Sequence, residues 1–478
     1  MAVKLAVIGG GPGGYVAAIR AASLGADVTI IEKENFGGTC LNWGCIPSKI
    51  MKNSADLYNK LKKSASLGIT ITGELSFDMD ALMERKNKVL ESQRKGIESL
   101  LQGHQINIEK GRAKIVSPGH IDVADTATGK SIGVDYDHLI IATGTEPLNV
   151  SDFPFDHERI LSSNDILEID SVPESIVIIG GGVIGCEFAF IFASLGSQVT
   201  VVEALSRLLP LPAVDESCSK ILLREMKKAK IKVICDTVVT GAVQNGDQLD
   251  ITIDDSPFTD NPRPKKAGER QITGSKMAVC IGRSPLSVDL GLETIGVETD
   301  DRGWIKVNEN LQTNIENVWA IGDILGPSRV MLAHVASHEG IIAAENILGQ
   351  KKEMNYDVIP GAIFTMPEIG TVGLSESEAL KKCMDIECFS VNFRTLGKAQ
   401  AIDEIAGEVK VIVNKADRTL LGVHMIGPHA TDLIAEATLA IQQKVTVEQI
   451  AHTIHAHPTL AEIMGEVALK ASGSAIHG

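Results

Sequence analysis

The sequence predicts an α/β protein with two domains of like architecture, followed by an α+β domain of a different kind. A glycine-rich turn between an apolar strand and a helix occurs twice, at Gly9 and at Gly180, and a glutamate follows each turn at the same distance, Glu32 and Glu203. Such a strand, turn and helix is the βαβ unit of a Rossmann-like domain. From Tyr356 onward these turns stop, and strand-like and helix-like runs alternate, which is typical of an α+β domain.

The first glycine-rich turn lies in the context that dinucleotide binding requires. The apolar run 4–8 predicts a strand, 15–24 has a helical pattern, and 28–31 predicts the next strand. Gly9 is expected to make the turn, Gly11 to admit a pyrophosphate, Gly14 to pack helix on strand, and Glu32 to bind ribose hydroxyls. A lone glycine motif is weak evidence, but here strand, helix and acid agree.

The second turn repeats this pattern with Gly180, Gly182 and Gly185, between a strand at 176–179 and one at 199–203 that ends in Glu203. Because glycines and acid match together, we interpret the repeat as a second nucleotide-binding domain. The chain is therefore expected to bind two dinucleotides.

Directly after the first βαβ unit, Cys40 and Cys45 lie in the glycine-rich run 37–49. Residues five apart on an ideal helix are roughly 8.5 Å apart, whereas a disulfide needs about 5.5 to 6 Å. The helix is therefore expected to be distorted, with Gly37, Gly38 and Gly44 supplying the freedom. Thiols inside cells stay reduced unless a disulfide is catalytic or sensing, so the pair is a redox candidate.

Composition limits the classes of function. The 478 residues should form about three domains. A formal charge of −16 argues against nucleic acid or anionic membrane as partners, since both need basic patches. The chain starts in a strand, without an apparent signal or transit segment or membrane span, so the cytoplasm is the expected location. The other six cysteines have no paired metal-ligand spacing and are expected to be core thiols.

Several segments between these motifs have simpler interpretations. The pattern at 81–101 predicts a long exposed helix, and the short runs 106–108, 113–116 and 121–124 suggest a small meander. Residues 154–173 fit a linker, and 255–270 an exposed hairpin loop of no assigned function. A strand at 318–321 ends in Gly322-Asp323, which places a carboxylate where ligands bind in parallel sheets.

Near the C-terminal end, three histidines lie close together, His452, His455 and His457. A metal site is not favoured, because no cysteine accompanies them and the spacing is not that of zinc helices. Pro458 biases His457 toward an extended backbone at a helix entrance, with Glu462 one turn further in. A carboxylate there can orient an imidazole and raise its basicity. His452 and His455 are expected to be structural.

These signatures together resemble the pyridine nucleotide-disulfide oxidoreductases, and the resemblance extends over essentially the whole chain. Within that family the chain is most similar to the branch that oxidises protein-bound dihydrolipoamide and reduces NAD. The resemblance implies FAD at the first βαβ unit and NAD at the second, and a homodimer formed by the C-terminal domain. It also implies a lipoyl-bearing carrier protein of a 2-oxo acid dehydrogenase complex or of glycine cleavage as partner, with no nucleic acid or membrane.

The same resemblance assigns roles to residues. Cys45 would contact the flavin as a thiolate, Cys40 would exchange with substrate sulfur, and His457, oriented by Glu462, would be the acid-base residue, supplied by the neighbouring subunit. The other residues expected near FAD are Lys49, Ala113, Thr143, Gly144, Asp323, Ala333 and His334. Val238 is expected near the adenine of NAD, Gly282 lies in the segment that returns to the flavin domain, and Glu187 would tune the flavin together with Lys49. The implied domains are residues 1–150 and 281–352 for FAD, 151–280 for NAD, and 353–478 for dimerisation.

Three other functions compete with this interpretation. A related disulfide reductase, such as one for glutathione, uses the same scaffold, and a flavoprotein that only docks into an assembly would keep the fold. Mercuric reductase is disfavoured, because the tail 465–478 lacks a cysteine pair.

Glu203 favours NAD over NADP, since its carboxylate would repel a 2′-phosphate. Arg207, four residues further on, is the one feature that could favour the phosphate.

Overall fold

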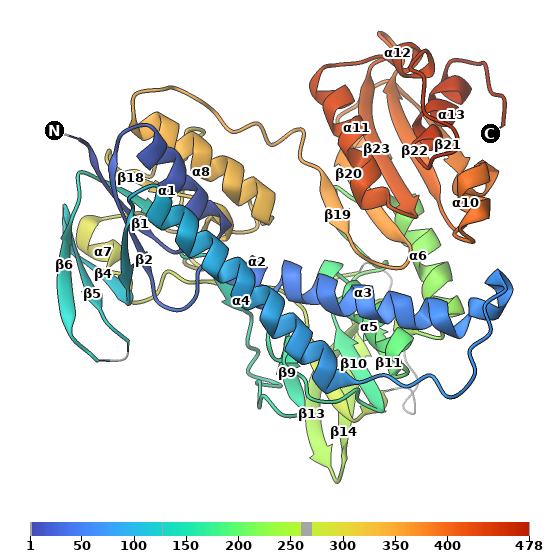
Figure 1. Ribbon diagram of the computed structural model, residues 1–478, viewed down its shortest axis with the longest axis horizontal. Coiled ribbons are helices and arrows are strands. Elements are labelled where there is room, and N and C mark those ends of the chain that lie inside the picture. Colours follow the sequence, from blue (N-terminus) through green and yellow to red (C-terminus); the bar gives the residue numbers. More distant parts are fainter. Residues whose placement is uncertain (1, 127, 260–269, 478) are drawn as a thin grey trace. The chain divides into compact units, whose positions relative to one another are not determined.

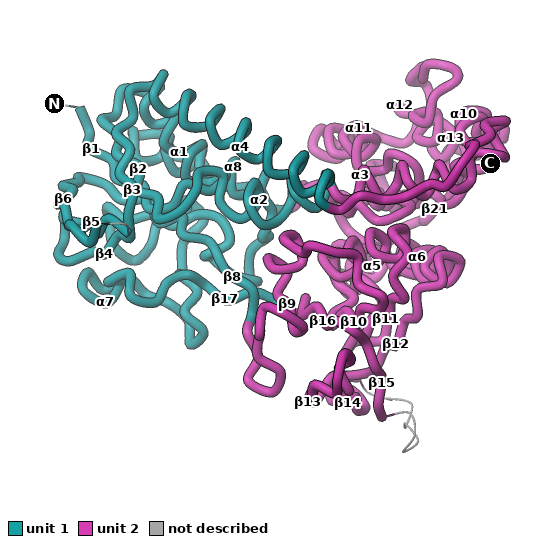
Figure 2. The backbone as a smooth tube through the Cα atoms, turned by 60° about the horizontal axis from the view of Figure 1, so that its bottom comes forward, with its two compact units in different colours: residues 1–50, 80–148, 282–356 teal, residues 51–79, 149–281, 357–478 magenta. Residues whose placement is uncertain are grey.

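The computed structural model describes residues 2–126, 128–259 and 270–477. The chain divides into two compact units, each assembled from separate segments (Figure 2). The first unit contains residues 1–50, 80–148 and 282–356, and the second contains 51–79, 149–281 and 357–478. In the described part of the chain, no helix is both long enough and apolar enough to cross a membrane.

The first unit is built on a parallel sheet of five strands in the order β18-β7-β1-β2-β3. Their bounds are Val318–Ala320, His138–Ile141, Lys4–Ile8, Asp27–Glu32 and Asn107–Lys110. The central strands are buried on both faces, as expected of parallel strands that helices cover. Helices α1 (Pro12–Ser23) and α8 (Ala333–Ile347) lie side by side (Figure 1). They approach closely at Gly13 and Gly340, where an added Cβ would meet the backbone of the other helix.

Smaller elements complete the first unit. An antiparallel sheet contains β4 (Arg112–Ser117), β5 (His120–Ala124) and β6 (Ser131–Asp135), and a two-stranded ribbon pairs β8 (Thr145–Pro147) with β17 (Arg283–Pro285). The expected meander is therefore present, but 106–108 does not belong to it. Strand β3 pairs in parallel with β2 instead, because it follows a long helix that returns the chain to the sheet edge. The remaining elements here are α7 (Leu292–Ile295) and η4 (Gly322–Leu325).

Between β2 and β3 the chain is helical. Helices α2 (Gly38–Trp43) and α3 (Cys45–Lys62) follow one another directly, and η1 (Ser64–Leu67) and α4 (Met79–Gly103) come after them. The long helix expected at 81–101 is confirmed. It is not exposed throughout, since Leu82, Lys86 and Leu90 are buried.

The second unit contains another parallel sheet, in the order β12-β11-β10-β16-β9. The strands are Lys232–Ile234, Gln198–Val202, Ser175–Ile179, Lys276–Val279 and Ile160–Ser162, with helices α5 (Val183–Leu195) and α6 (Glu216–Lys228). Strand β9 lies within the segment expected to be a linker, and that expectation is wrong there. The strand completes the edge of the sheet, pairing Ile160 with Met277. It is followed by η2 (Asp165–Leu167).

A three-stranded antiparallel sheet extends from this part of the chain, formed by β13 (Thr237–Asn245), β14 (Gln248–Asp255) and β15 (Gln271–Gly274). Most of the loop expected at 255–270 joins β14 to β15 and lies outside the described residues.

The C-terminal part of the second unit is the expected α+β structure. Its antiparallel sheet has the order β19-β20-β23-β22-β21, with strands Gly361–Ile363, Glu368–Gly373, Leu420–Gly427, Glu408–Asn414 and Ile386–Asn392. Helix α11 (Ala430–Gln442) packs on β20 and β23, and α13 (Glu462–Ala471) packs on β21 and β22 (Figure 1). The short elements are α9 (Glu376–Lys381), η5 (Phe393–Thr395), α10 (Gly397–Ala401) and α12 (Val447–Ala451).

Candidate active site

The first glycine-rich turn has the geometry that the sequence predicts. Gly9 adopts φ 107°, a conformation that favours glycine. A Cβ on Gly14 would run into the carbonyl of Gly9, so helix α1 can start this close to β1 only with glycine there. Glu32, at the end of β2, accepts hydrogen bonds from the amides of Gly10 at 2.7 Å and Glu34 at 2.8 Å. Burial raises the pKa of this carboxyl, while the two amide bonds oppose the shift.

The second turn repeats this geometry almost atom for atom. Gly180 has φ 102°, and a Cβ on Gly185 would run into the Gly180 carbonyl. Glu203 accepts from the amides of Gly181 at 2.6 Å and Leu205 at 2.7 Å. Gly182 caps the start of α5, and a Cβ added to it would meet no atom of the described residues within 4 Å, so the space in front of the helix is open. Each unit therefore presents a helix N-terminus beside a buried glutamate, which suits the phosphates and ribose of a dinucleotide.

The cysteine turn breaks the helix between the two sulfurs, as predicted. Cys40 lies in α2 and Cys45 begins α3, with Gly44 between them at non-helical angles (φ −152°, ψ −107°). Gly38 has φ 53°, and a Cβ there would lie 2.7 Å from the Cα of Gly11. The cysteine turn and the first glycine-rich turn are thus packed directly together, because glycine stands at the contact on both sides.

The two cysteines are thiols in this structure, and they interact. The hydrogen bond to Cys45 raises the pKa of Cys40 well above its ordinary value, and burial and the charges of Cys45 and Asp323 act in the same direction, while Lys49 opposes them. The surroundings of Cys40 therefore favour its protonated form. Lys49 Nζ also lies 3.3 Å from Ser48 Oγ, in the first turn of α3.

Two residues around this turn had no role in the sequence interpretation. Asn42 is 1% exposed; its amide donates to the carbonyls of Phe36 at 3.1 Å and Gly38 at 2.9 Å, and it accepts from Arg94 Nε at 2.6 Å. It closes the loop that presents the cysteines. No pattern in a single sequence identifies an asparagine as such a clamp, because its partners are backbone carbonyls.

The second of these residues is Arg283, at the start of β17. Its guanidinium donates to Thr145 Oγ1 at 2.6 Å, to the Thr145 carbonyl at 2.8 Å and to Thr39 Oγ1 at 3.4 Å. Burial lowers its pKa, and the charges of Asp323, Glu146 and Cys45 oppose that shift. The arginine thus places a positive charge between the cysteine turn and Asp323. Its position directly after Gly282 was the available signal.

The other residues expected near FAD all lie in the first unit. Asp323, in η4 after β18, is half-buried; desolvation raises its pKa, and Arg283 and the hydroxyl of Thr145 at 3.4 Å oppose the shift. Gly144 has φ 69° at the end of β7, and Ala113 lies buried in β4. Ala333 and His334 begin α8.

The side chain of Thr143 tests whether these surroundings suit a polar cofactor. Its Oγ1 is buried and has no hydrogen-bond partner within the described part of the chain. A buried hydroxyl without a partner is costly, so its environment is complete only when a ligand supplies one. Together with the N-terminus of α1 and the carboxylates of Glu32 and Asp323, this fits a dinucleotide such as FAD.

The remaining residues expected to bind cofactors, Val238, Glu187 and Gly282, fall in both units. Val238 lies in β13, and Glu187 lies in α5, where it is 6% exposed and accepts from the Phe364 amide at 2.9 Å. Gly282 belongs to the first unit and has φ 139°. Lys49 and Glu187, expected to act together, lie in different units.

His457 and Glu462 are paired in the second unit. His457 Nδ1 lies 2.8 Å from Glu462 Oε1, and Oε2 accepts from the Thr459 amide at 2.9 Å. Burial of Glu462 raises its pKa, but the hydrogen bonds from His457 and Thr459 and the charges of His457 and His455 outweigh it, so the pKa is lowered. The helix that was expected to begin near His457 begins at Glu462 itself. The imidazole side chain is 75% exposed, with Nε2 left to receive a proton.

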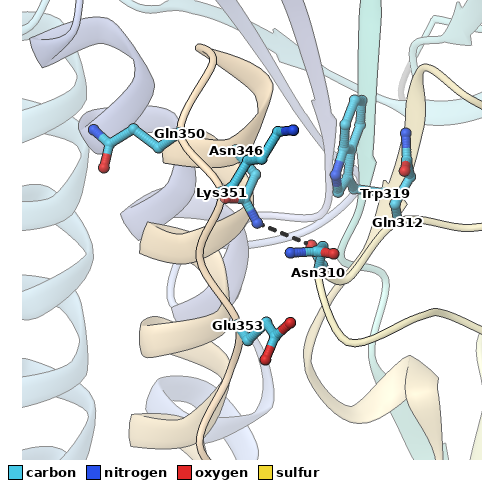
Figure 3. Close-up of a pocket in the computed structure, with 7 residues that line it drawn as sticks. All are labelled: Asn310, Gln312, Trp319, Asn346, Gln350, Lys351 and Glu353. Atoms are coloured by element: carbon cyan, nitrogen blue, oxygen red, sulfur yellow. Dashed lines mark hydrogen bonds between the residues drawn. The ribbon is translucent and has the colours of Figure 1, made fainter.

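A cavity of about 560 Å³ in the first unit contains none of the expected site residues (Figure 3). Its lining residues are Asn310, Gln312, Trp319, Asn346, Gln350, Lys351 and Glu353. The amide of Asn346 donates to the carbonyls of Asn310 at 3.2 Å and Lys352 at 2.8 Å. These polar groups fasten the end of α8 to the preceding loop, so we assign the cavity no part in the site.

The remaining cysteines are only partly as expected. Cys186 and Cys218 are buried, and burial raises the pKa of Cys218 to about 12. Cys235, Cys280 and Cys388 are half-buried. Cys383 is exposed, so the expectation of a core thiol is wrong for this residue.

The fold, with its two glycine-rich βαβ turns and the adjacent cysteine pair, indicates an oxidoreductase that uses dinucleotide cofactors. Residues 3–340 match the model of the pyridine nucleotide-disulphide oxidoreductases, and residues 359–468 match the dimerisation domain of the same family. The chain belongs to this family.

Individual relatives are similar over their full length. A dihydrolipoyl dehydrogenase of Chlamydia trachomatis is 39% identical over 474 residues, covering 98% of this chain and 97% of the relative. One of Haloferax volcanii is 37% identical over 475 residues, covering 99% and 97%. The crystal structure of LpdA from Mycobacterium tuberculosis superimposes with a TM-score of 0.89 at 25% identity, covering 98% of this chain and 99% of that one.

Proposed function

We propose that this enzyme oxidises protein-bound dihydrolipoamide to lipoamide and reduces NAD to NADH. The observation that carries the proposal is the interacting pair Cys40 and Cys45, packed against the first glycine-rich turn. Full-length similarity to relatives named dihydrolipoyl dehydrogenase supports the choice of substrate. The cofactors are FAD, held by the first unit, and NAD.

The residues proposed to hold FAD are those that surround its site in the first unit. The turn of Gly9, Gly11 and Gly14 takes the pyrophosphate, and Glu32 binds ribose. The others are Lys49, Ala113, Thr143, Gly144, Asp323, Ala333 and His334. For NAD we propose Gly180, Gly182, Gly185, Glu187, Glu203, Val238 and Gly282.

The proposed thiol chemistry uses two pairs of residues, Cys40 with Cys45 and His457 with Glu462. In the oxidised enzyme Cys40 and Cys45 form a disulfide. His457, oriented by Glu462, takes a proton from one substrate thiol at Nε2, because a thiol of pKa about 8.5 is mostly protonated at neutral pH. The thiolate attacks the sulfur of Cys40, a mixed disulfide forms, and Cys45 leaves as a thiolate. The second substrate thiol then displaces Cys40 and closes the lipoamide disulfide.

The substrate dithiol has then lost two electrons and two protons, and the enzyme holds both electrons as a dithiol. FAD, when bound, supplies the two-electron path from Cys45 to the nicotinamide. NAD takes up two electrons and one proton as a hydride, and one proton is released from His457. The lowered pKa of Glu462 keeps its carboxylate ionised throughout, so it can stabilise the protonated imidazole.

Assembly and location complete the proposal. We divide the chain into FAD segments 1–150 and 281–352, an NAD domain 151–280 and a dimerisation domain 353–478, which together form a homodimer. The partner is a lipoyl-bearing carrier of a 2-oxo acid dehydrogenase complex or of glycine cleavage. We place the enzyme in the cytoplasm, and its acidic charge supports the absence of nucleic acid and anionic membrane among its partners.

A steady-state assay of the purified protein tests this function. We expect a yellow protein that turns over free dihydrolipoamide with NAD and is at least a hundredfold less efficient with glutathione disulfide and NADPH. A colourless protein, or one that prefers glutathione disulfide, would show that the proposal is wrong.

A further inference from the structure

The segment that carries His457 has little regular structure to hold it. Residues 452–461 connect α12 to α13 without a helix or strand. Ile454 is 96% exposed, and the side chain of His457 is 75% exposed. A base must nevertheless be held accurately, since a displacement of about 1 Å can cost roughly a hundredfold in rate.

The side chain of His455 links this segment to helix α11. The side chain of His455 is 10% exposed, and its Nε2 lies 2.9 Å from Glu436 Oε1 on α11. Its Nδ1 lies 3.1 Å from the carbonyl of Thr453, at the start of the same segment. His455 thus bonds the start of its own loop, at Thr453, and also bonds α11, the helix that packs on β20 and β23.

The ring also contacts α13 at a position that has no side chain. A Cβ on Gly465 would lie 3.0 Å from His455 Nδ1 and 3.4 Å from Cε1, so a larger residue would press on the imidazole. The ring is therefore wedged between Glu436 on α11 and Gly465 on α13. This helix also begins with Glu462, the partner of His457.

The chemistry of the contacts explains why histidine suits this place. Both ring nitrogens face oxygen atoms, the Glu436 carboxylate on one side and the Thr453 carbonyl on the other. The charge of His455 also contributes to the lowered pKa of Glu462, so the two imidazole-carboxylate pairs are electrostatically connected.

We propose that His455 and Glu436 are positioning residues for the His457 base. The pair holds residues 453–457 between α11 and α13, so that Nε2 of His457 keeps its direction while Nδ1 stays on Glu462. This inference rests on the proposed function for its catalytic meaning, but the structural part stands by itself.

The test combines turnover with amide hydrogen exchange of the full-length enzyme carrying FAD. In His455→Ala and Glu436→Ala we expect kcat for dihydrolipoamide and NAD to fall 10- to 100-fold, with KM for NAD unchanged. Reduction of ferricyanide by NADH, which needs the flavin but no base for a thiol, should stay within twofold of wild type. Exchange of the amides in 453–461 should become at least tenfold faster.

Controls separate positioning from general damage. Exposed His452→Ala should leave all these values unchanged, and Glu436→Gln, which keeps an acceptor oxygen, should recover most of kcat. The double variant should lose no more than either single one, since both act through one contact. Unchanged exchange in 453–461, or kcat within twofold of wild type in His455→Ala, would overturn the inference. A wild-type enzyme that does not oxidise dihydrolipoamide would refute the proposed function instead, while the exchange result would still decide the inference.

Discussion

Replacing Asp215 by Asn should destabilise the second unit at neutral pH. Asp215 is 2% exposed and caps helix α6 by accepting from the Ser217 amide at 3.0 Å. It also accepts from Lys410 Nζ on β22 at 2.9 Å and from the Glu376 amide at 3.1 Å. One carboxylate therefore joins helix α6, which connects β11 to β12 of the parallel sheet, to β22 and α9 of the C-terminal α+β structure.

The magnitude follows from the pKa of this carboxyl. Burial raises it, but the hydrogen bonds and charge of Lys410 and the two amides outweigh burial and lower the pKa from 3.8 to about 2. A shift of this size corresponds to about 2.4 kcal/mol in favour of the folded state. Because the folded pKa is depressed, this contribution is fully present above pH 3.8 and is lost as the pH falls through about 2. Between pH 5 and 8 the loss in Asp215→Asn should therefore be constant.

Hydrogen exchange can measure this loss locally, which matters because a protein of several domains rarely unfolds in one step. Asparagine keeps an oxygen for the helix cap but removes the charge, so amides of α6 and α9 should exchange about 60-fold faster. All three tryptophans, Trp43, Trp304 and Trp319, lie in the first unit, so their fluorescence should not change.

The matched control is Lys220→Met, also on α6. Its ion pair with Glu216 is exposed and 3.3 Å long, and such pairs contribute only about 0 to 1 kcal/mol. The reasoning would be refuted if Asp215→Asn behaved like this control. It would equally be refuted if the difference from wild type changed between pH 5 and 8.

Three further predictions concern the active site. Cys45→Ser should abolish the long-wavelength charge-transfer band in the absorption spectrum of the two-electron-reduced enzyme. Cys40→Ser should leave a thiolate beside the flavin and block exchange with the substrate. Indistinguishable spectra of the two variants would contradict these roles. NAD should be preferred over NADP by at least tenfold in kcat/KM, because Glu203 repels a 2′-phosphate and the guanidinium of Arg207 is already bound to Ser219 Oγ and the Leu209 carbonyl; comparable efficiency with NADP would refute this. If His457 acts from the neighbouring subunit, mixing Cys45→Ser chains with His457→Gln chains should give heterodimers that are far more active than either parent. The signal should be clear, because loss of a general base lowers the rate by a factor of about 10² to 10⁴. Proven subunit exchange without restored activity would show that the base is supplied within one chain.

Local sequence determined the motifs whose chemistry depends on neighbours along the chain. The glycine positions of both βαβ units follow from steric rules, because a Cβ at Gly14 or Gly185 would collide with the preceding turn. The break between Cys40 and Cys45 was also predictable, but from distance: two sulfurs five residues apart cannot meet on a regular helix. The contact of His457 with Glu462 also spans only one turn of chain.

Tertiary structure decided the features whose partners are far apart in sequence. Strand β9 seemed a linker because a three-residue edge strand has no periodicity of its own and exists only by pairing with β16. Contacts with backbone carbonyls or with distant side chains define the roles of Asn42, Arg283 and the pair of His455 with Glu436. No local sequence pattern encodes these contacts. Such contacts form only when distant parts of the chain have packed together, so the stability that they contribute depends on the tertiary structure and not on any one segment.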